Sequence, residues 1–393
     1  MKTYLLPMTA TLAGAAVSLL SCSVNRPEGI TRAESTLDSI YVHYGVDGTC
    51  LLRENFPSAP EYKATYLASE EQALPNPYSY LWPFSGTLSA AGAILESDKG
   101  FIKVIDGRIL PGLYEYHDTS RQPYAYASYI SSAPVSDRFY DDNVWLGIDF
   151  CDIYEATGDR KYLEQAENIW KFIESGTDDV LGGGIYWCEQ KKTSKNTCSN
   201  APGTVYALKL YKATGDTGYL EQAQALYDWT KDNLMDREDH LYFDNIGING
   251  NIGKAKFAYN SGQMVQAGAL LYEITGNEEY LTDARLTADA CLGYFFHEFT
   301  GDDGKTFRLI NKGNVWFSAV MVRGFVELFR LTGDTDYIND IISSLDYAWS
   351  HARDEHGLFE EDFSGKAKNK RKWLLTQAAM AEMFARTADL KTK

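Results

Sequence analysis

A sequence motif of polar and apolar residues, called the repeated phrase below, recurs along the chain at long and regular intervals. Each copy begins Thr-Gly-Asp or Thr-Gly-Asn, continues with two variable residues, and then reads Tyr followed by Leu or Ile. The copies cover residues 157–166, 214–223, 275–284 and 332–341. Their tyrosines lie 57, 61 and 57 residues apart, at Tyr162, Tyr219, Tyr280 and Tyr337. Such regular spacing is typical of proteins built from stacked supersecondary units.

Each phrase predicts a tight turn between two antiparallel helices. The glycine ends one helix because it accepts the left-handed backbone conformation without a Cβ clash. The Asp or Asn after it caps the next helix by accepting its free N–H groups. Apolar residues then follow at helical spacing. In the first copy this stripe consists of Tyr162, Leu163, Ala166, Ile169, Trp170 and Ile173.

The interval divides the chain into about six helix pairs. One helix of each pair is expected to begin near Ser85, Asp141, Ser199, Tyr259, Asn314 and Arg371. The partner helices are expected near Thr31, Asp98, Asp159, Asp216, Asn277 and Asp334, the first of them with a capping box from Thr31 to Glu34. This pattern predicts an all-α fold, a single (α/α)6 toroid over residues 31–390, with an open superhelix as the alternative.

Long loops lead into the expected inner helices. They cover residues 46–84, 117–140, 176–198, 234–258, 297–313 and 353–370. In a toroid these loops meet at one mouth, so the functional residues are expected there.

The amino terminus has the pattern of a secretory signal. Lys2 precedes an apolar stretch from Leu5 to Leu20 that is too short to span a bilayer and is interrupted by Pro7. The end of residues 1–22, Leu-Leu-Ser-Cys, resembles the bacterial lipobox, which implies cleavage before Cys22 and lipidation of that residue. Residues 23–30 are expected to form a tether. We therefore expect a protein anchored by lipid in the bacterial cell envelope, on a membrane face that the sequence does not specify.

Composition narrows the possible partners. The formal net charge is −17, which disfavours nucleic acid and anionic lipid surfaces as partners. The spacing of histidines and cysteines does not fit a metal site, and we expect neither metal nor cofactor. The protein is expected to be a monomer whose only membrane contact is the lipid anchor. Besides the lipidated Cys22, the mature chain has five cysteines, namely Cys50, Cys151, Cys188, Cys198 and Cys291, of which Cys188 and Cys198 are near enough in sequence to form a bridge.

Two adjacent carboxylates, Asp141 and Asp142, lie where a long loop meets an inner helix. Carboxyl groups of consecutive residues are about 5–6 Å apart, which suits the ~5–5.5 Å of retaining glycosidases better than the ~6.5–9.5 Å of inverting ones. Repulsion between the two charges raises one pKa, which favours one protonated acid and one ionised nucleophile. The alternative is ordinary helix capping, for which Asp is well suited.

The segment Tyr140–Trp145, YDDNVW, resembles the signature of family 76 glycoside hydrolases, the bacterial endo-α-1,6-mannanases. Residues 80–86, 182–187, 195–200 and 259–260 also resemble that family. The resemblance implies an (α/α)6 fold and endo-acting, retaining hydrolysis of α-1,6-mannosidic bonds in α-mannan polysaccharide or oligosaccharide. It implies that Asp141 is the nucleophile and Asp142 the acid/base.

Other loop residues suit a sugar ligand. Trp82 and Trp187 can stack on the apolar face of a sugar, or instead cover the ends of the helical core. Asn143, Asn200 and Asn260 can bind sugar hydroxyls, but each also lies at an expected helix start; Tyr140 and Tyr259 precede such helices and fit binding or core packing equally. Two rival functions stay open: a toroid hydrolase with another glycan or stereochemistry, and a non-catalytic glycan-binding surface lipoprotein.

Overall fold

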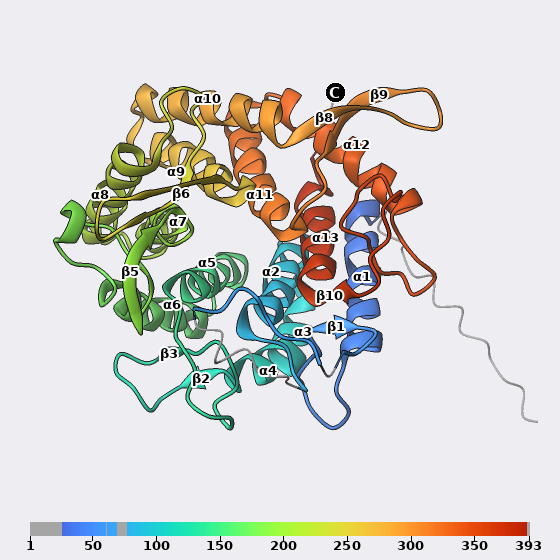
Figure 1. Cartoon of the computed structure of the whole chain (residues 1–393), viewed down its shortest axis with the longest axis horizontal. Coiled ribbons are helices and arrows are strands. Elements are labelled where there is room, and N and C mark those ends of the chain that lie inside the picture. The colour runs from blue at the N-terminus through green and yellow to red at the C-terminus, as the bar shows by residue number, and fades with distance from the viewer. Residues whose placement is uncertain (1–25, 60, 69–76, 391–393) are drawn as a thin grey trace, which may run out of the picture.

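The computed structural model describes residues 26–59, 61–68 and 77–390. The predicted signal, Cys22 and the first part of the tether therefore lie outside the described residues. The chain is mostly helical (Figure 1). The helices are α1 (Glu28–Tyr44), α2 (Leu81–Ser97), α3 (Ile102–Val104), α4 (Leu110–Tyr114), α5 (Tyr140–Thr157), α6 (Arg160–Glu174), α7 (Thr197–Thr214), α8 (Thr217–Leu234), α9 (Ala258–Thr275), α10 (Glu278–Tyr294), α11 (Val315–Thr332), α12 (Asp336–His351) and α13 (Leu374–Thr387). Among these described helices, none is long and apolar enough to cross a membrane.

The repeated phrase forms the predicted turns. Gly158, Gly215, Gly276 and Gly333 end α5, α7, α9 and α11 with φ between 69° and 75°. The Asp159, Asp216 and Asn277 side chains then accept a backbone N–H at the start of α6, α8 and α10. Because both signals act on local backbone, the helix pairs were predictable from sequence.

Six of the helices pack side by side in sequence order. α2, α5, α7, α9, α11 and α13 each contact the next, and α13 contacts α2. α6, α8, α10 and α12 pack on the helix that precedes them, while α1 packs along α13 (Figure 1).

Two predictions for partner helices were wrong in detail. α1 begins at Glu28, not near Thr31, and Pro27 takes the N-cap position. The buried Ile30 adds a turn to the helix, so the segment from Thr31 to Glu34 lies inside α1 and forms no capping box. Residues 28–30, which were expected to belong to the tether, lie in α1.

The partner of α2, expected near Asp98, is broken into a 3-10 turn at 99–101, α3, a π turn at 105–109 and α4. Gly100, Gly107 and Gly112 lower the helix propensity of this segment. Gly112 also allows the close approach of the 46–80 loop, because a Cβ there would lie 2.4 Å from the Cys50 carbonyl oxygen.

Short strands join the long loops, which the helical pattern did not predict. β1 (Asn55–Phe56) pairs with β10 (Lys372–Trp373), β2 (His117–Asp118) with β3 (Ala125–Tyr126), and β8 (Phe296–Thr300) with β9 (Thr306–Ile310), all antiparallel. β4 (Tyr186–Cys188), β5 (Lys191–Asn196), β6 (Phe243–Gly247) and β7 (Ile252–Lys256) form one four-stranded sheet. The β5–β6 pairing links the loops that enter α7 and α9, and thus fixes the starts of these helices relative to each other.

Candidate active site

The second residues of five inner helices line one cleft of about 510 Å³. Helical side chains tilt toward the N-terminus of their helix, so residues at this position point out of the helix ends into the space between the loops. These residues are Trp82 of α2, Asp141 of α5, Cys198 of α7, Tyr259 of α9 and Trp316 of α11.

Asp141 is surrounded by hydrogen-bond donors. Its Oδ2 accepts from the Trp187 indole Nε1 at 3.1 Å and from the Cys198 thiol at 3.3 Å. Its Oδ1 accepts from the Asp142 backbone N–H at 3.1 Å. Burial raises the pKa of Asp141 to about 6, and the three donors oppose that rise because they favour the ionised form. Asp141 is therefore ionised at neutral pH.

Asp142 lines the same cleft in a different electrostatic environment. Burial, followed by the charge of Asp141, holds the pKa of Asp142 well above its usual range. Burial therefore outweighs the start of the helix, which favours ionised carboxylates. The two neighbouring carboxyl groups are thus arranged as one carboxylate and one carboxylic acid.

Helix capping does not account for this pair. The N-cap of α5 is Phe139, in extended backbone, and no side chain caps the helix there. The Oδ2 of Asp141 points instead to Trp187 and Cys198, which come from the next loop and the next inner helix.

Asn143 and Asn200, predicted to contact substrate, hold loop backbone instead. The buried Asn143 amide bonds the N–H and carbonyl of Tyr126 and the carbonyl of Phe139. The buried Asn200 amide bonds both backbone groups of Ile185 in the same way. Neither residue is among those lining the cleft.

Asn143 and Asn200 are the fourth residues of α5 and α7, and the fourth residue of two further inner helices also bonds loop backbone. Ser261 of α9 accepts from the Tyr242 N–H, and Gln377 of α13 bonds both backbone groups of Phe359. An alignment of the helix starts in the sequence would have shown this shared position.

The other predicted binding residues divide between the cleft and the core. Trp82, Trp187 and Tyr259 line the cleft. Tyr140 is buried and stacks on Phe172 with ring centroids 4.6 Å apart, and Asn260 is fully buried.

Several cleft residues escaped the sequence analysis. Asp244 and Asn245 come from β6, Tyr66 comes from the 46–80 loop, and Phe317 is the third residue of α11. The Phe317 ring stacks on that of Tyr259, with centroids 4.1 Å apart. The aromatic members of the lining are Tyr66, Tyr80, Trp82, Phe139, Trp145, Trp187, Phe257, Tyr259, Trp316 and Phe317.

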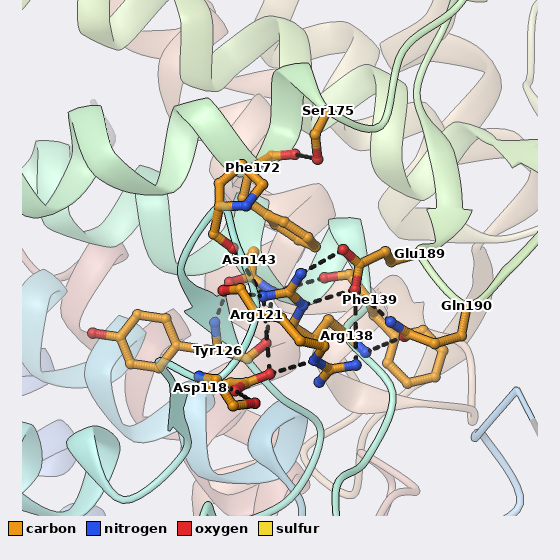
Figure 2. Close-up of polar contacts among 12 residues, drawn as sticks. Asp118, Arg121, Tyr126, Arg138, Phe139, Asn143, Phe172, Ser175, Glu189 and Gln190 are labelled. Atoms are coloured by element: carbon orange, nitrogen blue, oxygen red, sulfur yellow. Dashed lines mark hydrogen bonds and ion pairs between the residues drawn. The ribbon is translucent and has the colours of Figure 1, made fainter.

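A buried arginine fixes the loop that leads into α5. Arg138 lies near the end of the 117–140 loop, and Figure 2 shows it beside Glu189 and Gln190 of the turn after β4. Its guanidinium donates to both carboxylate oxygens of Glu189 and to the carbonyl of Pro123, and its backbone N–H donates to the Gln190 side chain. Arg138 is fully buried. This network sets the path of the chain three residues before Asp141.

The Cys188–Cys198 bridge suggested by sequence proximity was wrong. Both thiols are free, as are those of Cys50, Cys151 and Cys291. Cys188 packs against Phe139, and the Cys198 thiol donates a hydrogen bond to Asp141. Within the described ranges, no group of three or more His, Cys, Asp or Glu side chains can hold a metal ion.

Comparison with known proteins gives consistent matches. The family model Glycosyl hydrolase family 76 matches residues 74–310. The structure of a family 76 glycoside hydrolase (mannosidase) from Bacteroides thetaiotaomicron is 33% identical with a TM-score of 0.84, covering 92% of this chain and 98% of that chain. A TM-score of 0.73 at 24% identity relates the fold to an inactive variant of an α-1,6-mannanase from Salegentibacter sp. HEL1_6 in complex with α-1,6-mannotriose, over 92% of this chain and 100% of that one.

Curated relatives match over shorter segments. A mannan endo-1,6-alpha-mannosidase from Candida glabrata is 32% identical over 109 residues, which cover 25% of this chain. The matched segment spans about a quarter of that relative, 24% of its length.

Proposed function

We propose, because this chain belongs to glycosyl hydrolase family 76, that it is a retaining endo-hydrolase of α-1,6-mannosidic bonds in mannan. The single observation that best supports this activity is the pair of adjacent carboxyl groups in one cleft, of which Asp141 accepts three hydrogen bonds while burial and the charge of Asp141 raise the pKa of Asp142. Two carboxyl groups in these environments are what double displacement at an anomeric carbon requires.

The reaction then proceeds in two steps. Asp142 donates its proton to the leaving glycosidic oxygen while the Asp141 carboxylate attacks the anomeric carbon. Asp142, now ionised, takes a proton from a water molecule as the water oxygen attacks the anomeric carbon, and the bond between that carbon and Asp141 breaks. The donors from Trp187, Cys198 and the Asp142 N–H hold the Asp141 carboxylate in place before attack.

The cleft lining supports a neutral sugar chain as substrate. Rings of Trp82, Trp187 and Tyr259 offer apolar faces for sugar rings, and polar groups of Asp244 and Asn245 lie among them. The similar proteins include an α-1,6-mannanase and a mannan endo-1,6-alpha-mannosidase.

The helix contacts support a closed (α/α)6 toroid as the architecture. Each inner helix packs on the next, and the contact of α13 with α2 completes the ring, which disfavours an open superhelix. α1 supplies the outer partner of α13, so the first and last helices form the sixth pair.

Products and pH dependence test the activity together. On debranched α-1,6-mannan we expect a ladder of oligosaccharides, with the α-anomer released first in proton NMR. kcat/KM is expected to fall as pH drops through about 6, because Asp141 becomes protonated, and to fall again at high pH when Asp142 loses its proton. Binding without turnover, or release of the β-anomer first, contradicts the proposal.

The amino terminus supports a lipid anchor, which is a separate proposal. Residues 1–22 have the signal and lipobox pattern, so the lipidated Cys22 is proposed to hold a monomer at the bacterial envelope. The Cys22→Ala variant should lose incorporation of labelled fatty acid and leave the membrane fraction, whereas the Ser23→Ala control should not. Membrane retention of both variants would argue against the anchor.

A further inference from the structure

Cys198 lies closer to the reacting groups than its residue type suggests. It is the second residue of α7, is only 3% exposed, and its Sγ lies 3.3 Å from Asp141 Oδ2. A buried cysteine is ordinarily a small apolar packing residue. This one lines the cleft and touches the carboxylate itself.

The direction of the hydrogen bond follows from charge. Burial, and after it the carboxylate of Asp141, holds the pKa of the Cys198 thiol well above its usual range, so the thiol keeps its proton. A protonated thiol beside a carboxylate can only donate, since the carboxylate has no hydrogen to give. Tyr259 of α9 lines the same cleft, and its side chain opposes the rise in the pKa of Cys198.

We propose that Cys198 is a positioning residue for the nucleophile, its thiol orienting the Asp141 carboxylate and favouring the ionised form needed for attack. This inference rests on the proposed function. Trp187 donates to the same oxygen, so two side chains from separate elements fix one rotamer of Asp141. Because a thiol is a weak donor, it holds the carboxylate without stabilising its charge as strongly as a hydroxyl at hydrogen-bond distance.

Other titratable groups near Asp141 bear on any pH measurement. Asp142 is its neighbour on α5, Cys188 lies on β4, Asp244 on β6 and Tyr259 on α9. Removing the Cys198 thiol leaves all of these groups in place. A shift of the pH profile between the variants therefore reports the loss of the thiol donor.

The first test is the pH dependence of kcat/KM on α-1,6-mannan. In the Cys198→Ala variant the acid limb of the kcat/KM profile should lie at a pH higher by roughly half to one unit. At pH values below this limb, kcat/KM should therefore be lower than in wild type by about 3- to 10-fold. Cys198→Ser keeps a donor at the position and should lie nearer to wild type than Cys198→Ala does. Cys291→Ala removes another buried helical thiol, away from the cleft, and should leave the profile unchanged.

A second readout needs no substrate. The infrared S–H stretching band of Cys198, obtained as wild type minus Cys198→Ala, should lie at the lower frequency typical of a donating thiol. It should move upward in Asp141→Ala, which removes the acceptor.

The outcomes separate the two proposals. If the wild type is active and the pH profile of Cys198→Ala superimposes on the wild-type profile, the positioning role alone is overturned. It is also overturned if Asp141→Ala leaves the S–H band at the same frequency. An acid limb of Cys198→Ser at the same pH as that of Cys198→Ala also overturns the positioning role. Wild type that hydrolyses no mannan overturns the proposed function and the positioning role with it.

Discussion

The Asp141→Asn variant is expected to abolish mannan hydrolysis, because an amide cannot attack the anomeric carbon and the covalent intermediate is lost. The Asp142→Asn variant should lower kcat by about 10²–10⁴-fold, the usual contribution of a general acid–base. The two single losses should not add in the double variant, because the residues act in one reaction. Initial rates on debranched mannan measure all three.

An activated substrate distinguishes the two roles. An aryl α-mannoside with a good leaving group needs no proton from the enzyme, so Asp142→Asn should keep its first step on this substrate. Asp141→Asn should remain inactive on both substrates. Equal rescue of both variants would contradict the assignment of nucleophile and acid.

A matched control is available on an outer helix. Asp159 caps α6 by accepting the Lys161 N–H, and asparagine caps helices as well as aspartate does. The Asp159→Asn variant therefore makes the same chemical change without altering the cleft, and it should retain wild-type rates.

The helix pairs were predictable because their signals are local. A glycine that ends one helix and an Asp or Asn that caps the next act within a few residues, as at Gly158 and Asp159. The Asp pair was also found from a local motif. The strands in the loops were not, because the β5–β6 pairing joins segments about fifty residues apart and depends on the finished fold.

The errors at the site have the same physical origin. Asn143 and Asn200 have the residue type of a sugar ligand, but their amides bond loop backbone that the fold brings to them. Cys198 shows the opposite case, since an apolar thiol in the sequence becomes a donor to Asp141 only after α7 packs on α5. Residue type indicates which bonds a side chain can form, whereas its partner is set by packing.

Loss of Arg138, which lies outside the cleft, should lower both stability and activity. The Arg138→Met variant leaves Glu189 without its buried partner, and breaking a buried ion pair costs about 3–5 kcal/mol of unfolding free energy. It also frees the 117–140 loop from its bonds to the guanidinium, so kcat should fall as Asp141 loses its fixed position.

Two comparisons make the Arg138 prediction specific. Arg121 is 25% exposed whereas Arg138 is fully buried, so Arg121→Met should cost less stability than Arg138→Met, although it removes a partner of Asp118 (Figure 2). A double variant, Arg138→Met with Glu189→Leu, removes both partners of this ion pair and should recover much of the lost stability. Because it still lacks the bonds to the loop backbone, its kcat should stay low even where urea unfolding shows a stable protein. An Arg138→Met protein as stable and active as wild type would show that this network does not position Asp141.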